Sequence, residues 1–417
     1  MKISDIKEEV RRMAEETEKE LRPVFDGIDR VAQINTEKVM TAFQEHRVSE
    51  ACFAGTTGYG YDDLGRETLD KIYAQIFGTE AALVRIGFVN GTHALTTALF
   101  AAVKPGDVIL SATGLPYDTL RNAIGIGEPL HGSLAFYGVD YAQVDLLPDG
   151  TPDYAAITEA AKHERVAAVT VQRSRGYEDR PALTVEQIGK ICAAVHAANP
   201  SAVVMVDNCY GEFTDVIEPT DVGADIIAGS LIKNPGGGIA PTGGYVAGKR
   251  ELVERAAMRL TAPGIGGECG STLGNNRLLY QGLFFAPHTV AQALKTAVFC
   301  AGMLKRIGID CSPAVDEKRS DIIEMLRLGS EEKMRRFCLG IQAGAPVDSY
   351  VTPEPWQMPG YNCPVIMAAG AFIQGSSIEL SADGPVREPY IAYMQGGLTY
   401  ESGKLGIMMA VSAMLEE

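Results

Sequence analysis

Short apolar runs alternate with helical periodicities through the middle of the chain. Nearly continuous apolar runs predict buried strands at 108–111, 167–171, 203–206, 225–228 and 245–247. Between these runs the apolar residues recur at helical spacing, which predicts helices over 94–103, 154–163 and 184–198. Buried strands that alternate with helices are typical of a mostly parallel sheet with helices on both faces, so we expect an α/β fold.

The two ends of the chain have a different pattern. Ile3, Ile6, Val10 and Met13 recur at steps of three and four with charged residues between them, which predicts an amphipathic helix within residues 3–46. This helix is either an exposed arm or an arm that packs on a partner subunit. Towards the C-terminus we expect a long helix over 290–307 and a second helix near 320–329. A hairpin should follow, with strands at 365–372 and 377–380 joined by residues 373–376.

These patterns divide the chain into three parts. We expect an N-terminal helical arm, a large domain and a smaller C-terminal α+β domain, at residues 1–50, 51–289 and 290–417. The length of 417 residues agrees with two or three units of about 150 residues.

Composition and charge exclude several classes of protein. The chain has 37 Lys+Arg against 53 Asp+Glu, a net charge of −16, whereas a nucleic-acid or anionic-membrane partner requires a basic face. The eight cysteines include no C-x-x-C pair, which is typical of reduced thiols in a cytoplasmic protein. No apolar run is long enough to span a bilayer, the first residues lack an apolar leader, and no H-E-x-x-H motif occurs. We therefore expect a cytoplasmic protein with no membrane partner and no metal.

Two charged residues stand at the ends of neighbouring predicted strands. Asp207 ends the run at 203–206, and Lys233 follows the next run and precedes the glycine-rich segment 234–238. Taken alone, Asp207 is either a cap or turn residue or a carboxylate that meets a cation, and a single lysine is most often a solvated surface residue. Together they lie where parallel sheets bind ligands, and a desolvated lysine there can form a Schiff base.

Two further segments add candidate binding groups at the same sheet edge. Residues 90–93, Asn-Gly-Thr-His, directly precede a predicted helix. Thr92 is either the N-cap of this helix or, with the free backbone N–H groups, part of a phosphate site. Tyr117 follows the strand at 108–111 and is either a packing residue or an aromatic platform for a ring.

Several motifs together resemble one family. They are GYGYDDLGRETLDKIYAQIFGTEAALV (58–84), NGTHALTTALF (90–100), LPYDTL (115–120), QRSRGYEDRP (172–181), VDNCYGEF (206–213), GSLIKNPGGG (229–238) and REPYIAYMQGGLTY (387–400). The chain resembles, over nearly its whole length, the fold-type-I pyridoxal-phosphate enzymes of cysteine and methionine metabolism. Within this group it is most similar to the methionine gamma-lyase-like family, often labelled aluminium-resistance proteins.

The resemblance implies the cofactor pyridoxal phosphate and a role for each matching residue. Lys233 is expected to hold the cofactor covalently and to move a proton, Asp207 to pair with the pyridinium nitrogen, and Tyr117 to stack on the ring. The remaining expected cofactor-binding residues are Gly91, Thr92 and Ser230 at the phosphate, with His93 beside them.

The resemblance also implies shared active sites. The family has a Tyr-x-Arg pair that reaches the phosphate of the neighbouring subunit, whereas this chain has Tyr59-Gly-Tyr61 and lacks the arginine. We expect a homodimer or homotetramer, with Tyr59 and Tyr61 as cofactor-binding residues.

Three arginines are candidates for the carboxylate of an amino-acid substrate. Arg387 is the preferred candidate because a guanidinium binds a carboxylate through two hydrogen bonds, and Arg173 and Arg175 are the others. For each arginine a structural or surface ion pair remains open. We interpret Cys209 as a buried free thiol.

The predicted activity is β- or γ-elimination with cleavage of a C–S bond in a sulfur-containing amino acid or an analogue. The alternatives are other pyridoxal-phosphate chemistry (an aminotransferase, a racemase or an aldolase) and a non-catalytic protein with the same fold. Glycine makes up 45 of the 417 residues, and 12 of these lie within the 46 residues of 229–274. We therefore expect close backbone approach to a ligand around Lys233.

Overall fold

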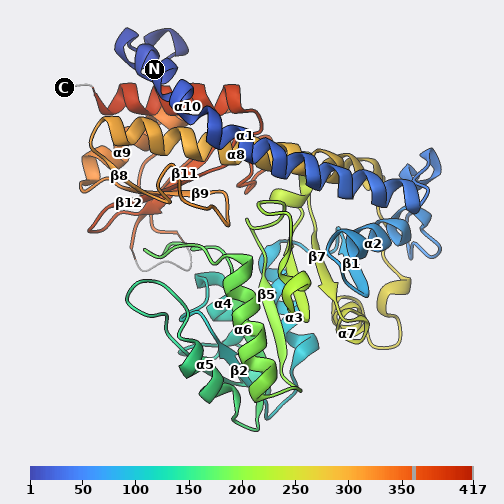
Figure 1. Ribbon diagram of the computed structural model, residues 1–417. Coiled ribbons are helices and arrows are strands. Elements are labelled where there is room, and N and C mark those ends of the chain that lie inside the picture. The colour runs from blue at the N-terminus through green and yellow to red at the C-terminus, as the bar shows by residue number, and fades with distance from the viewer. Residues whose placement is uncertain (359–362, 416–417) are drawn as a thin grey trace.

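The computed structural model describes residues 1–358 and 363–415, which form a large and a small domain (Figure 1). The large domain contains a seven-stranded sheet in the order β1 (Ala81–Arg85), β7 (Gly244–Gly248), β6 (Ile226–Ser230), β5 (Val203–Asp207), β4 (Val166–Gln172), β2 (Val108–Ser111) and β3 (Asp140–Gln143). Strand β7 is antiparallel to β1 and β6, and the pairs from β6 to β3 are parallel. The mostly parallel α/β sheet predicted from the sequence is confirmed.

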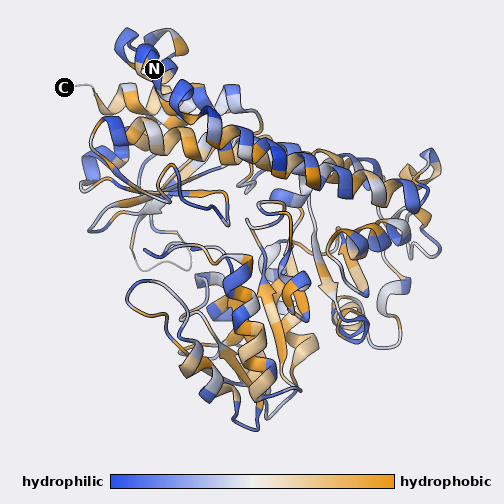
Figure 2. Ribbon diagram, in the orientation of Figure 1, coloured by the Kyte–Doolittle hydropathy of each residue, from blue (hydrophilic) through white to orange (hydrophobic). Residues whose placement is uncertain are grey.

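Helices cover both faces of this sheet because its strands are apolar on both sides (Figure 2). One face packs against α2 (Leu64–Ile76), α5 (Tyr154–Ala161), α6 (Val185–Ala198) and α8 (Asn276–Arg306). The other face packs against α3 (Gly91–Ala102), α4 (Asp118–Ile124) and α7 (Arg250–Leu260).

Side-chain caps fix where several of these helices begin. The side chain of Asn90 accepts a hydrogen bond of 2.9 Å from the backbone N–H of His93, so α3 begins at Gly91, three residues before the predicted start. Thr184 and Gln187 form a reciprocal capping box at the start of α6.

The small domain is built on a five-stranded antiparallel sheet. Its strands follow the order β10 (Val365–Ala369), β11 (Ser381–Pro385), β12 (Ile391–Gln395), β9 (Ile323–Arg327) and β8 (Asp310–Ser312). Helices α9 (Glu331–Ala343) and α10 (Tyr400–Met414) pack on one face of this sheet.

Two predictions for this domain are corrected by the structure. The helix predicted near 320–329 is wrong, because residues 323–327 form strand β9, which pairs with β12 and β8. The apolar spacing over so short a segment does not distinguish a strand from a helix. The predicted hairpin exists, but its second strand begins at Ser381 and not at Ser377. The carboxylate of Glu379 accepts the backbone N–H groups of Phe372 and Ile373, and this holds the connection as a loop.

Helix α1 (Glu8–Glu45) runs alongside α8 across both domains (Figure 1). Val10, Leu21, Phe25 and Val39 of α1 are buried, so the prediction of an exposed arm is wrong and the arm packs on its own chain. Helix α8 starts 14 residues before the predicted position and is continuous through the predicted domain boundary after residue 289. Within the described residues, no helix combines the length and apolar character needed to cross a bilayer.

Candidate active site

The carboxyl ends of β5 and β6 open into a cavity of about 520 Å³ between the two domains. Asp207 is the last residue of β5, and Lys233 follows Ser230, the last residue of β6. Because these neighbouring strands are parallel, their carboxyl ends lie at one edge of the sheet. Asp207, Ser230 and Lys233 all line the cavity.

The ammonium group of Lys233 is held against an aromatic ring. Its Nζ lies 3.9 Å from the centroid of Tyr210, within the range of a cation–π interaction. Burial by itself lowers the pKa of Lys233, but Cys209, Tyr210 and Asp207 beside it leave that pKa above its usual range. Lys233 is therefore a protonated amine with Asp207 among its neighbours.

The carboxylate of Asp207 is oriented by the backbone that follows it. Its Oδ1 accepts a hydrogen bond of 3.1 Å from the backbone N–H of Cys209. Burial raises the pKa of Asp207, whereas the charge of Lys233 opposes this shift. Burial and the charge of Asp207 raise the pKa of the Cys209 thiol well above its usual value, so Cys209 is a protonated thiol in the cavity wall.

The start of α3 forms a close-fitting cradle. Gly91 is the first residue of this helix, and a Cβ added there would lie 3.3 Å from Cβ of Ser230 and 3.6 Å from Sγ of Cys209. The hydroxyl of Thr92 lies 2.7 Å from that of Thr119. Backbone N–H groups at a helix start, together with hydroxyls and a residue without a side chain, suit a phosphate group.

The ring of Tyr117 borders the same cavity as this cradle. Its backbone N–H donates to Oε1 of Gln172 over 2.8 Å, which fixes the start of α4 against β4. Its ring centroid is 6.1 Å from that of Tyr177, which in turn is 5.2 Å from that of Tyr393. These three tyrosines form one continuous aromatic wall.

An amine, a carboxylate, a phosphate cradle and an aromatic ring are the groups that pyridoxal phosphate requires. Lys233 can bind the aldehyde, Asp207 can pair with the pyridine nitrogen, the cradle at Gly91 and Ser230 can bind the phosphate, and Tyr117 can stack on the ring. All of these residues line the same cavity, so the residues present fit the cofactor.

The structure does not bring all predicted cofactor-binding residues to this cavity. His93 lines a second cavity, of about 540 Å³, and its Nδ1 accepts the backbone N–H of Val89. Tyr59 also borders that second cavity, and its ring stacks on Tyr61 with centroids 5.6 Å apart. Tyr59 and Tyr61 are 74% and 58% exposed, so neither ring is engaged within its own chain as a cofactor ligand would be.

The three candidate arginines have different surroundings. Arg173 is fully buried and bonded to Asn208, Thr214 and Glu218 at 2.7, 3.1 and 3.1 Å. These bonds make Arg173 a structural residue.

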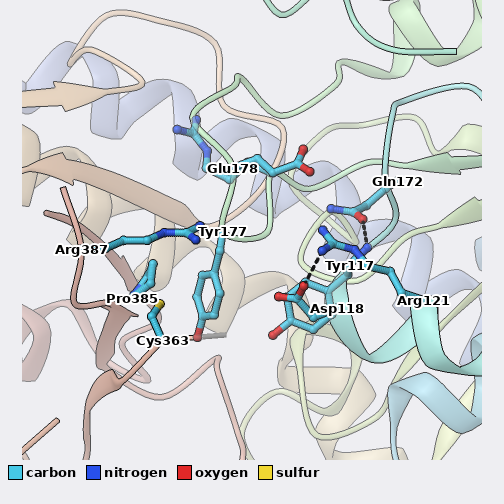
Figure 3. Close-up of a pocket in the computed structure, with 10 residues that line it drawn as sticks. Tyr117, Asp118, Arg121, Gln172, Tyr177, Glu178, Cys363, Pro385 and Arg387 are labelled. Atoms are coloured by element: carbon cyan, nitrogen blue, oxygen red, sulfur yellow. Dashed lines mark hydrogen bonds and ion pairs between the residues drawn. The ribbon is translucent and has the colours of Figure 1, made fainter. Parts of the chain in front are cut away.

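Arg175 and Arg387 both border a smaller cavity of about 230 Å³ beside Tyr117. Arg175 is fully buried, and its Nε and Nη2 have no hydrogen-bond partner among the described residues. Arg387 is exposed and approaches from the small domain. Figure 3 shows the Tyr177 ring between Arg387 and the Tyr117–Asp118 side of this cavity.

The comparisons with known proteins agree with this geometry. The family model described as methionine gamma-lyase matches residues 10–415. The chain belongs to the methionine gamma-lyase family. An uncharacterized protein of Bacillus subtilis, YnbB, is 47% identical over 98% of this chain and 97% of its own length.

Solved structures give the same result for this member of the methionine gamma-lyase family. A carbon–sulfur lyase involved in aluminium resistance from Clostridium novyi is 52% identical and superposes with a TM-score of 0.94, over 98% of this chain and 96% of its own. A putative cystathionine beta-lyase involved in aluminium resistance from Clostridium acetobutylicum is 50% identical, with a TM-score of 0.95 over 99% and 97% of the two chains. The L-methionine gamma-lyase of Pseudomonas putida is 27% identical over about half of each chain.

Sequence reasoning missed the small-domain wall of the cavity. This wall includes Met367, Asp383, Tyr393 and Gln395, which come from β10, β11 and β12. Their approach to Lys233 depends on how the two domains dock, and no local pattern in the sequence signals that docking. Tyr210 lies in a motif used for the resemblance, but its contact with Lys233 depends on a left-handed backbone with φ of 71°.

Proposed function

We propose that this protein is a pyridoxal-phosphate-dependent lyase that cleaves a C–S bond in a sulfur-containing amino acid. The main support is that Asp207, Lys233 and the cradle at Gly91 border one cavity. The family match and the names of the similar structures, a carbon–sulfur lyase and a putative cystathionine beta-lyase, support the same reaction class.

When bound, pyridoxal phosphate supplies an electron sink for the bonds at Cα of an amino acid. Lys233 would serve as the base that removes the Cα proton, because it is the residue with an amine among those that line this cavity. Asp207 would hold a positive charge at the ring nitrogen, and Tyr117 would stack on the ring. These residues position the reacting atom between the two domains.

Arg175 is the proposed partner of the substrate carboxylate. A buried guanidinium with two unbonded nitrogens requires an anion or strong acceptors, and a carboxylate supplies two acceptors in the matching geometry. Arg387 borders the same cavity but is exposed, so its charge is already solvated. Arg387 is therefore assigned to the cavity entrance.

A second copy of the chain is the proposed partner at Tyr59 and Tyr61. The loop that carries them contacts the loop at 270–273, where Leu273 is also exposed, and together they present apolar surface. Sedimentation analysis of the holoenzyme tests this proposal. We expect a dimer or tetramer for the natural chain and a smaller species for Tyr59→Ser with Tyr61→Ser, whereas a fully active monomer contradicts it.

Product analysis tests the proposed reaction. Purified protein with added pyridoxal phosphate is incubated with cysteine, cystathionine, homocysteine and methionine, and keto acid, ammonia and thiol are measured. Release of all three products from at least one substrate, lost in Lys233→Ala, is the expected result. Transfer of the amino group to a second keto acid, without thiol release, identifies an aminotransferase and contradicts the proposal.

A further inference from the structure

Among the described residues, the small-domain wall of the cavity carries one carboxylate, that of Asp383. This residue lies on β11 directly opposite Tyr393 of β12, and both line the cavity that holds Lys233. Asp207, Ser230 and Lys233 belong to the large-domain wall, which would hold the cofactor. The small-domain wall is therefore the surface that remains for the substrate.

The carboxylate of Asp383 has polar neighbours, but one of its oxygens has no hydrogen-bond partner among the described residues. Its side chain is buried, its Oδ1 has no partner within the described residues, and its Oδ2 has a long hydrogen bond of 3.4 Å from Nε2 of Gln395. Burial raises the pKa of Asp383 to about 6, and hydrogen bonding from the side chains of Tyr177 and Gln395 opposes this shift. No lysine or arginine is among the causes of this shift, so the described residues place no cation beside this buried carboxylate.

A buried carboxylate in this state favours a ligand that brings a positive charge or strong N–H donors. The other charged residues are assigned to the cofactor or to the α-carboxylate of the substrate. The positive charge that Asp383 can bind must therefore lie at the far end of the substrate. Lys233 and Asp207 are assigned to the cofactor, and Arg175, which lines the smaller cavity on the other side of Tyr117 and Tyr177, is assigned to the α-carboxylate. The part of the substrate beyond its sulfur then lies against Met367, Asp383 and Gln395.

On the basis of the proposed function, we infer that Asp383 determines substrate specificity by binding an ammonium group carried on the sulfur-bound leaving group. The substrate class is an S-substituted cysteine or homocysteine with a second amino group. Amino acids with a plain alkyl group on sulfur are poorer ligands, because they leave the carboxylate buried and unpaired.

Two ligands that differ only at the far end of the side chain test this inference. S-(2-aminoethyl)-L-cysteine ends in an ammonium group and S-propyl-L-cysteine ends in a methyl group. Their dissociation constants are measured on the holoenzyme at pH 7.5 from the change in visible absorption of the cofactor, which requires no turnover. The expected result for the natural chain is binding of the aminoethyl ligand at least about tenfold tighter than the propyl ligand.

Asp383→Asn keeps the shape of the side chain and removes its charge. In this variant we expect the two ligands to bind within about threefold of each other, mainly because the aminoethyl ligand binds more weakly. The matched control is Asp310→Asn on β8 of the same sheet, an exposed aspartate paired with Arg327, which should keep the preference of the natural chain.

Other outcomes overturn the inference. Equal binding of both ligands to the natural chain contradicts it even if the Asp383→Asn variant does not fold. An equal loss for both ligands in the variant assigns Asp383 to the shared α-amino end and also contradicts it. Keto acid release is measured in parallel, and its absence with both ligands contradicts the proposed reaction while the binding comparison still decides the role of Asp383.

Discussion

The ammonium nitrogen of Lys233 lies 3.9 Å above the ring of Tyr210, whose hydroxyl donates a hydrogen bond of 2.9 Å to Ser377. Tyr210 belongs to the large domain and Ser377 to the loop between β10 and β11. One side chain therefore both positions the candidate catalytic amine and connects it to the small domain.

Removal of the Tyr210 ring should weaken cofactor attachment. The ring restricts the Lys233 side chain, and ordering a free lysine side chain costs about 1 kcal/mol, so we expect about fivefold weaker binding of pyridoxal phosphate in Tyr210→Ala. Tyr210→Phe keeps the ring and should bind like the natural chain. Titration of the cofactor-free protein by visible absorption measures both, and equal weakening in the two variants would show that only the hydroxyl matters.

Loss of Arg173 should reduce stability and not substrate binding. Arg173→Gln leaves the buried carboxylate of Glu218 without its cation, which lowers the free energy of unfolding by about 3–5 kcal/mol. Urea unfolding of the cofactor-free protein measures this change. A variant of unchanged stability with a raised KM would instead place Arg173 in the substrate site.

Loss of Arg175 should instead weaken substrate binding. Because Arg175→Gln removes the proposed partner of the substrate carboxylate, we expect KM to rise roughly 100-fold, with a smaller change in kcat. The matched control is Arg387→Gln at the cavity entrance, for which less than about a tenfold rise is expected. Steady-state keto acid release measures both variants. A larger effect in Arg387→Gln would reverse the assignment of the two arginines.

Glu212 should make the folded protein less stable as the pH rises. Burial raises the pKa of Glu212 to about 8, from an ordinary value of 4.5, despite hydrogen bonds from the backbone and from Tyr245. Between these two values the folded state binds more protons than the unfolded state, so stability falls with increasing pH. The contribution of one such group is at most about 1.4 kcal/mol per pH unit.

Thermal unfolding of the cofactor-free protein from pH 5 to pH 8 measures this effect. Glu212→Gln keeps an acceptor for the Tyr245 hydroxyl and cannot ionise, so its Tm should fall less over this range than that of the natural chain. Glu324, whose pKa burial raises to about 7, acts in the same direction in both proteins and cancels in the comparison. Parallel Tm curves would show that Glu212 does not titrate in this range.

The sequence was sufficient to predict the large-domain half of the site. Asp207, Lys233 and Ser230 follow buried parallel strands, and Gly91 opens a capped helix, so local patterns and the geometry of a parallel sheet bring them to one edge. Asp383 and Tyr393 could not be predicted, since they reach the cavity only through the docking of a separate antiparallel sheet.

The neighbouring arginines show the same limit on a smaller scale. Arg173 and Arg175 are two positions apart, and both are buried, yet only Arg173 meets a carboxylate within the large domain. Both are arginines in the same short segment, so the local sequence does not distinguish them. Their different roles arise from Glu218 and from the cavity border, which only the folded chain places beside them.

The covalent attachment point of the cofactor tests the central claim most directly. The holoenzyme is reduced with borohydride, which makes an imine between a lysine and pyridoxal phosphate permanent, and the peptides are then weighed by mass spectrometry. The control variant is Lys249→Ala, because Lys249 follows the antiparallel strand β7 and therefore lies at the other edge of the sheet. We predict one labelled peptide that contains Lys233, unchanged labelling in Lys249→Ala, and none in Lys233→Ala. A natural chain that acquires no label at Lys233, or a Lys233→Ala variant labelled as strongly as the natural chain, would contradict the account.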